Sequence, residues 1–204
     1  HYVLGYQARR YMLAHLQRGF TIIELVVTLA LFGVLLGLGI PSFTSFINNA
    51  QIKNAAENAL QGFNLAKADA VRRNASVRFQ LVTDLTSTCA PSTTGKNWVV
   101  SLDDPTGKCN IAPSDTVDPR IVQKLSGDEG ARNVSVTAIG ASSAVFNGLG
   151  RIVGTGITQM DFAHTTAICE HVDANGTARC LRILISAGGQ VKMCDPKVAA
   201  ATDP

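Results

Sequence analysis

The chain has 204 residues, of which 46% are hydrophobic and 16% charged, and its formal net charge is +3. This length accommodates one globular domain and a long helix. Because Arg9, Arg10 and Arg18 all lie before residue 20, the rest of the chain has 15 basic and 15 acidic side chains. That balance excludes the strong overall positive charge typical of proteins that bind nucleic acids.

An apolar run over residues 20–40 follows this basic segment. A helix of about 20 apolar residues crosses the hydrocarbon core of a membrane, so the run predicts a membrane helix. The basic residues before it predict a cytoplasmic N-terminus, with the rest of the chain across the membrane. A cleaved secretory signal peptide is the alternative, but Pro41 and Ser42 do not form the small-residue site that it needs.

Glu24 is the one charged residue inside this run. A carboxylate in the membrane core costs roughly 2.5–3.5 kcal/mol on insertion scales, so it is expected to have a partner or a function. One explanation is a position close enough to the interface for the carboxylate to reach water. The other is a cut between Gly19 and Phe20, which creates a positive α-amino group that attracts Glu24, in the same chain or in a neighbour.

The stretch Gly19-Phe20-Thr21-Ile22-Ile23-Glu24 resembles the prepilin-peptidase site of type IV pilins and of type II secretion pseudopilins. Glycine before the cut, phenylalanine after it, glutamate fifth in the cut chain and Pro41 at its twenty-second position all match. The resemblance implies that prepilin peptidase cuts between Gly19 and Phe20 and N-methylates Phe20. A leader that begins at Met12 has a typical length for this family.

The apolar run also contains small residues that weaken a helix. Gly33 and Gly37 have the G-x-x-x-G spacing that lets two helix backbones approach closely. The alternative is that they are only the small residues common in membrane helices. In pilins the corresponding segment loosens during assembly. Gly33, Gly37 and Pro41 are therefore predicted to take part in assembly together with Glu24.

Residues 42–75 are predicted to continue the helix as an amphipathic segment, because apolar residues recur there at helical spacing. The expected buried stripe is Ile52, Ala56, Ala59, Leu60, Phe63, Ala66 and Ala70. Residues 76–204 are predicted to form an exported domain with short strands at 77–82, 98–100, 134–139, 181–185 and 190–193, the last two joined by a turn at Gly188-Gly189. The predicted fold class is α+β, a long N-terminal helix packed on a mostly antiparallel β-sheet, as in pilins.

Five cysteines lie in the predicted domain: Cys89, Cys109, Cys169, Cys180 and Cys194. An exported domain meets an oxidising compartment, so disulfides are expected, and the spacings match no zinc pattern. Cys89 and Cys109 enclose a loop rich in Pro, Thr and Gly and are the preferred first pair. Cys169 and Cys180 could pair across a turn at residues 173–176, and Cys194 could pair with either of them.

The stretch Phe146-Asn147-Gly148-Leu149-Gly150-Arg151, with the C-terminal hairpin, resembles the GspH/FimT group of minor pilins and pseudopilins and is FimT- or FimU-like. The resemblance implies a subunit at the pilus tip that helps to start assembly. Some FimT proteins bind DNA through a Gly-Arg-x-Arg motif in the last hairpin. The matching stretch here is Gly189-Gln190-Val191-Lys192, which departs from that motif, since Gln is uncharged and Lys lacks the fork of Arg.

A basic cluster of Arg179, Arg182 and Lys192 on the C-terminal hairpin is the remaining basis for binding DNA phosphates, which would depend on salt. The favoured alternative is a solvated strand face neutralised by nearby acidic residues. Catalysis by Cys169 with His164 or His171 is disfavoured, because histidines beside structural cysteines are common. The glycines over residues 148–156 lack the spacing of a phosphate-binding loop.

The favoured organisation is a removed leader (1–19), an assembly helix (20–41), an amphipathic helix (42–75) and an exported domain (76–204). The predicted function is a minor pilin of a type IV pilus that helps to initiate assembly or sits at the tip. A pseudopilin of a type II secretion system and a DNA-binding pilin of natural transformation are the alternatives. Expected partners are prepilin peptidase, other major and minor pilins and the inner membrane. The subunit later lies in the pilus at the cell surface, and we expect no enzymatic activity, cofactor or metal site.

Overall fold

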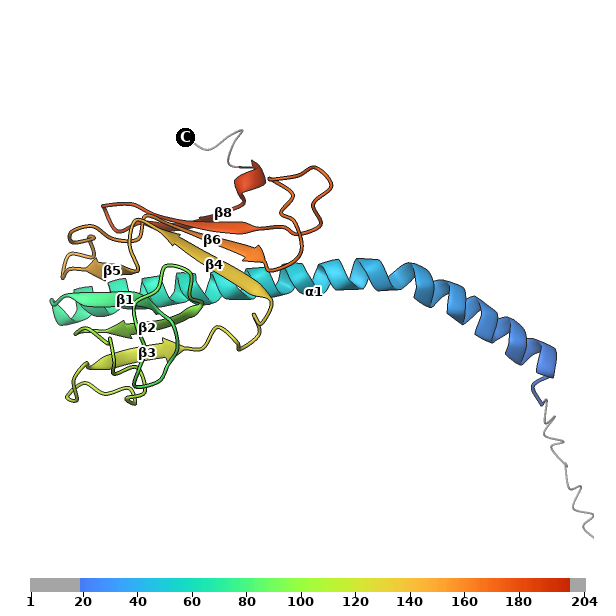
Figure 1. Cartoon of the computed structure of the whole chain (residues 1–204), viewed down its shortest axis with the longest axis horizontal. Coiled ribbons are helices and arrows are strands. Elements are labelled where there is room, and N and C mark those ends of the chain that lie inside the picture. The colour runs from blue at the N-terminus through green and yellow to red at the C-terminus, as the bar shows by residue number, and fades with distance from the viewer. Residues whose placement is uncertain (1–18, 199–204) are drawn as a thin grey trace, which may run out of the picture. The chain divides into compact units, whose positions relative to one another are not determined.

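The computed structural model describes residues 19–198 of the chain (Figure 1). The predicted leader lies outside the described residues, except for Gly19. The chain divides into two compact units, His1–Pro41 and Ser42–Pro204. One helix, α1 (Ile22–Arg73), contributes residues to both units. The side chains of residues 38–42, including Pro41, are outside the described part.

Thr21 determines where α1 begins. Its Oγ1 accepts a hydrogen bond of 3.2 Å from the backbone N–H of Glu24, and its carbonyl oxygen accepts one of 3.2 Å from the N–H of Leu25. A threonine followed three residues later by a glutamate is the sequence pattern of a capping box at a helix N-terminus. Among the described residues, no helix combines the length and the apolar content that crossing a membrane requires.

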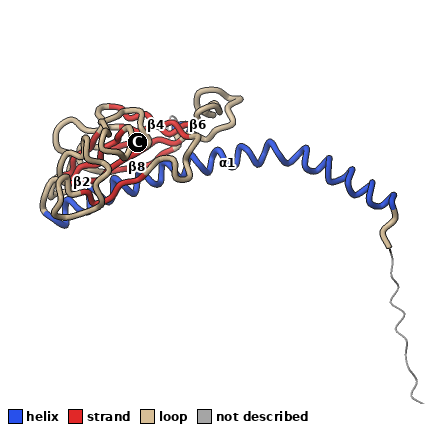
Figure 2. Tube along the Cα trace, turned by 60° about the horizontal axis from the view of Figure 1, so that its bottom comes forward, coloured by secondary structure: helices blue, strands red, loops and turns tan. Residues whose placement is uncertain are grey.

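The second unit contains two four-stranded sheets, and every strand pairing in them is antiparallel. The first sheet has the order β3 (Ile121–Leu125), β2 (Asn97–Ser101), β1 (Val77–Val82) and β5 (Ser143–Phe146). The second has the order β4 (Val134–Ile139), β6 (Gln159–His164), β7 (Leu181–Ile185) and β8 (Val191–Cys194). Both views show the strands gathered along the part of α1 that belongs to this unit (Figures 1 and 2).

The predicted α+β class is therefore confirmed, with two antiparallel sheets. The strands predicted at 77–82, 134–139 and 181–185 have these bounds in the structure. The sequence analysis did not predict β3, β5 and β6. The strand β5 has only four residues, and β6 carries Asp161 and His164, which weaken the apolar pattern that indicates a strand.

The predicted stripe of α1 forms the core. Its residues are buried, with Leu60 partly buried, and they pack against apolar residues of both sheets. The Phe63 ring stacks on the Phe79 ring of β1 with 3.9 Å between centroids. A Cβ atom on Gly62 would lie 2.7 Å from the Phe79 ring, so glycine there lets β1 approach the helix closely. Burial of each such large side chain stabilises the fold by roughly 1.5–3 kcal/mol.

Candidate assembly and binding sites

The N-terminal part of α1 presents an apolar surface that its own chain leaves uncovered. The large apolar side chains between Ile22 and Leu36 are 49–85% exposed. A Cβ atom on Gly33 or Gly37 would meet nothing within 4 Å, so no contact within the described chain requires glycine at either position. Soluble monomers rarely expose so large an apolar surface, which indicates contact with lipid or with other proteins.

Glu24 is the one ionisable residue on this apolar surface, and it is exposed. The predicted processing site lies just before it, where Gly19 and Phe20 are exposed and precede the first helical residue. A peptidase can therefore reach the bond between them without unwinding the helix. The cut at this bond and the assembly role of Glu24 both remain predictions.

The glycine-rich stretch singled out in the sequence forms a tight turn after β5. The Asn147 side-chain oxygen accepts hydrogen bonds of 3.0 Å from the N–H groups of both Leu149 and Arg151. A Cβ atom on Gly148 would collide with Asn74, the residue that follows α1. Gly150 has a positive φ of 72°, which favours glycine. The stretch therefore closes the end of α1 against β5 and does not form a phosphate-binding loop.

The β7–β8 turn contacts the same region. A Cβ atom on Gly189 would collide with the carbonyl oxygen of Gly150. The Lys67 Nζ donates a hydrogen bond of 2.8 Å to the Gly189 carbonyl oxygen. Gly189, the residue shared with the DNA-binding motif, is thus explained by close backbone packing. Sequence reasoning missed Lys67, because it lies 122 residues away along the chain.

The structure brings two of the predicted basic residues to one face of the C-terminal hairpin. Arg182 lies opposite Cys194, and Leu184 lies opposite Lys192. Because side chains alternate along a strand, Arg182 and Lys192 point to the same side. That side is directed away from the core, where Ile183 is fully buried.

Acidic partners neutralise much of this basic cluster. Arg182 on β7 lies directly opposite Asp161 on β6, and the Nε of Arg182 donates to Asp161 at 2.6 Å. Arg179 forms a second ion pair of 2.6 Å with Asp195. Lys192 is exposed and has no ion-pair partner among residues 19–198. The hairpin therefore offers DNA one unpaired cation from the three predicted contacts.

The ion pair of Asp195 with Arg179 changes the pKa of the Asp195 carboxyl group. Burial by itself raises the pKa of Asp195, because it disfavours the charged form. The Arg179 guanidinium and the Lys197 backbone N–H oppose that effect, and together they bring the pKa of Asp195 below its ordinary value. Asp195 is thus a charged partner of Arg179 at neutral pH.

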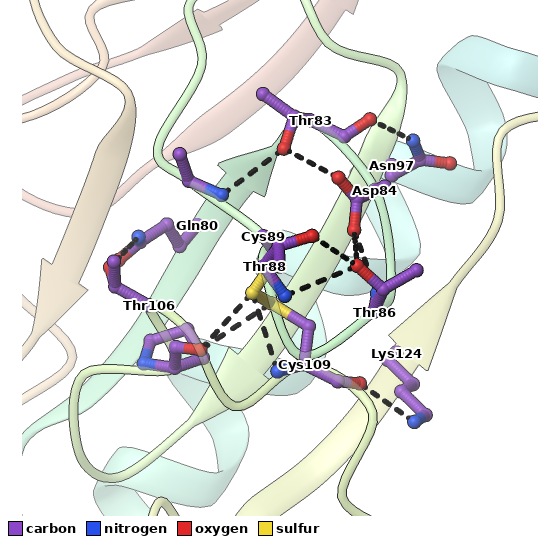
Figure 3. Close-up of a disulfide and its surroundings, with 12 residues drawn as sticks. Gln80, Thr83, Asp84, Thr86, Thr88, Cys89, Asn97, Thr106, Cys109 and Lys124 are labelled. Carbon is purple, nitrogen blue, oxygen red and sulfur yellow. Dashed lines mark hydrogen bonds between the residues drawn. A yellow bond between two sulfur atoms is a disulfide. The ribbon is translucent and has the colours of Figure 1, made fainter.

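The cysteines form two disulfides, Cys89–Cys109 and Cys169–Cys180. The first is the preferred pair of the sequence analysis, and it lies under a hydrogen-bonded loop that contains Asp84 and Thr86 (Figure 3). Lys124 on β3 donates a hydrogen bond of 2.8 Å to the Cys109 carbonyl oxygen, which ties the loop between β2 and β3 to β3. Cys194, on β8, belongs to neither disulfide.

The cluster of Cys169, Cys180 and His171 has ligand atoms within 4.8 Å of one another. Zinc and copper bind thiolates, however, and both sulfurs are joined in the disulfide, so neither is a thiolate ligand.

The other histidine considered for catalysis is His164. Its Nδ1 accepts a hydrogen bond of 3.0 Å from the N–H of Ala167. This contact caps the turn after β6, so the geometry gives His164 a structural role.

Two family profiles match this chain. The profile described as Prokaryotic N-terminal methylation motif matches residues 15–40, so the chain carries this class of N-terminal motif. The profile described as Type II transport protein GspH matches residues 55–189. The chain belongs to the GspH family, as the GspH/FimT resemblance predicted. The two matched segments follow one another along the chain, the methylation motif first and the GspH segment after it.

Individual relatives match over parts of the chain. The chain is 37% identical over 68 residues to the pilin-like protein PilA1 of Thermus thermophilus. The aligned segment covers 33% of this chain and 42% of that protein. The chain thus spans less than half of this relative. Two crystal structures of the type IV minor pilin FimU from Pseudomonas aeruginosa align with TM-scores of 0.45 and 0.47 and identities of 16% and 12%. They cover 71% and 74% of this chain and 93% of FimU.

Proposed function

We propose that this chain is a minor pilin of a type IV pilus that helps to initiate assembly or sits at the tip. Prepilin peptidase cuts between Gly19 and Phe20 and N-methylates Phe20. Residues 20–41 then hold the subunit in the inner membrane with its N-terminus in the cytoplasm. The domain over residues 76–204 lies in the periplasm and, after assembly, on the pilus surface.

The observation that carries this proposal is the uncovered apolar surface of α1, with Glu24 inside it, in a chain of the GspH family. The large side chains from Ile22 to Leu36 are at least 49% exposed in the single chain. Lipid covers them before assembly, and the helices of neighbouring pilins cover them afterwards. Each large apolar side chain that leaves water contributes roughly 1.5–3 kcal/mol. Lipid and a helix bundle thus both keep this surface out of water, and van der Waals packing between the helices favours the bundle over lipid.

Glu24 supplies the register in this proposal. A buried carboxylate without a partner costs several kcal/mol, so the helix is disfavoured at any position where Glu24 lacks a cation. The α-amino group of Phe20 on a neighbouring subunit is that cation after the cut. Slippage of one helix along another would separate the two charges. The charged pair thus selects one alignment of the subunit.

Glu24→Gln is the variant that tests this role, because it keeps the size of the side chain and removes its charge. The full chain is expressed in cells that have the other pilus components and lack the endogenous protein. We expect normal removal of the leader, measured by mass spectrometry, and strongly reduced recovery of the subunit in sheared pili. Glu57→Gln, on the same helix, is the matched control, because Glu57 is paired with exposed Lys53 at 3.6 Å. Equal recovery of Glu24→Gln and Glu57→Gln in pili would contradict the proposal.

A pseudopilin of a type II secretion system is the second candidate function. The matched family is described as Type II transport protein GspH, which favours this candidate. The two functions share the same N-terminal chemistry, so processing of the leader does not separate them. Deletion of the gene does: loss of pili with normal secretion of exoenzymes supports the pilus subunit. Loss of secretion with normal piliation would support the pseudopilin.

A further inference from the structure

The loop closed by the Cys169–Cys180 disulfide carries the tripeptide Asn175-Gly176-Thr177. Asn-x-Ser/Thr, with any residue but proline in the middle, is the acceptor sequence for N-linked glycosylation. The sequence contains two further tripeptides of this type, Asn74-Ala75-Ser76 and Asn133-Val134-Ser135. The three positions differ in how the fold presents them.

The first tripeptide is presented on a well-defined, exposed turn. The N–H of Gly176 donates 2.9 Å to the Asp173 carbonyl oxygen, and the N–H of Asn175 donates 2.9 Å to the Asp173 side chain. A Cβ atom on Gly176 would lie 2.7 Å from the Cys169 carbonyl carbon, so Gly176 is held against the base of the loop. Asn175 and Thr177 are exposed on either side of it.

The other two tripeptides are part of the folded framework. Asn74 follows the last residue of α1, has a positive φ of 48° and packs against Gly148. In the tripeptide Asn133-Val134-Ser135, Val134 is buried on β4. The Ser135 hydroxyl donates a hydrogen bond of 3.2 Å to the Ala163 carbonyl oxygen of β6. Ser135 itself is exposed, but a transferase that engages its hydroxyl would have to break this hydrogen bond between β4 and β6.

We propose that Asn175 is an acceptor site for N-linked glycosylation, with a polyprenyl-diphosphate-linked oligosaccharide as the donor. The Asn175 amide nitrogen forms a bond to C1 of the first sugar and loses one proton to a base of the transferase. The bond between C1 and the diphosphate oxygen breaks, and polyprenyl diphosphate leaves with its electron pair. The Thr177 hydroxyl is the recognition group of the acceptor. In the cell this inference rests on the proposed export of the domain, because a large polar glycan belongs on an exported surface.

The experiment uses the full chain, purified in detergent with both disulfides formed. It is incubated with a purified N-oligosaccharyltransferase and its lipid-linked oligosaccharide, and the product is analysed by intact mass and peptide mapping. We expect one added oligosaccharide, located on Asn175. Asn175→Gln and Thr177→Ala should each abolish the added mass. Ser76→Ala and Ser135→Ala are the matched controls and should leave it unchanged.

The reduced and unfolded chain is analysed in parallel to separate sequence from presentation. Modification of Asn175 in the unfolded chain alone would overturn the inference, because the folded turn would then hide the acceptor. Absence of modification in both forms would overturn it as well, as would equal modification of Asn74 or Asn133 in the folded chain. The reaction contains no pilus component. Its failure therefore leaves the proposed pilin function untouched, and a failed Glu24 test leaves this inference untouched.

Discussion

Lys67 of α1 donates a hydrogen bond of 2.8 Å from Nζ to the backbone carbonyl oxygen of Gly189, in the turn between β7 and β8. The two residues are 122 positions apart in the sequence. The contact is partly buried, and it joins the domain part of the helix to the last hairpin. The hairpin that the sequence analysis considered for DNA contacts thus has a structural role.

Lys67→Met should destabilise the domain, because it keeps the length of the side chain and removes the donor. A hydrogen bond from a charged group contributes about 1.5–3 kcal/mol to stability. We expect a loss of this size in the free energy of unfolding, measured on the full chain in detergent by urea titration. Lys53→Met is the control, because Lys53 is exposed and an exposed ion pair contributes about 1 kcal/mol or less. Similar losses in the two variants would refute the structural role of Lys67.

Gly189→Ala should be more damaging than an ordinary change at a turn glycine. Gly189 has a φ of 77°, and an added Cβ would collide with the Gly150 carbonyl oxygen. Gly154→Ala separates these two effects, since Gly154 has a φ of 69° and open space around its Cβ position. We expect about 1 kcal/mol of destabilisation for Gly154→Ala and at least twice that for Gly189→Ala, measured by thermal and urea unfolding. Equal effects would mean that the turn moves away without cost.

Binding of DNA by the C-terminal hairpin should be weak, because Asp161 and Asp195 neutralise Arg182 and Arg179. We expect little binding of the full chain to duplex DNA at low salt, measured by fluorescence anisotropy. Asp161→Asn should increase the affinity and its dependence on salt, since the variant releases one guanidinium for phosphate contacts. Tight binding by the unchanged protein that Lys192→Glu abolishes would favour the DNA-uptake function instead.

The stability of the domain should fall in acid partly through Asp195. Its pKa is lower in the folded chain than its ordinary value of about 3.9. The stabilisation is therefore complete above about pH 4 and is lost as the pH falls through the lower, folded pKa. Asp195→Asn should flatten the acid limb of a plot of unfolding free energy against pH. Glu129→Gln is the control for the removal of one carboxylate, because Glu129 is exposed and forms no ion pair within residues 19–198. Equal flattening in the two variants would contradict the role of Asp195.

Local sequence patterns were sufficient to predict several elements of the fold. The strands β1, β4 and β7 were predictable because apolar residues alternate or cluster within each of them. The buried stripe of α1 followed from helical spacing alone. In contrast, β6 contains Asp161 in the middle of the strand, and its pairing with Arg182 on β7 compensates for that charge. That compensation depends on strand register, which a single segment does not reveal.

The N-terminal processing site is a prediction that the sequence alone supports, because Gly19, Phe20 and Glu24 form one continuous stretch. The sequence is also sufficient to assign the family, since the methylation motif and the GspH domain are recognisable in the chain. The state of the C-terminal hairpin, in contrast, depends on contacts between distant segments. Arg182 is neutralised and Gly189 must be glycine because β6 and the turn after β5 are brought against them. Such contacts join residues that are distant along the chain, so their energies depend on the whole fold.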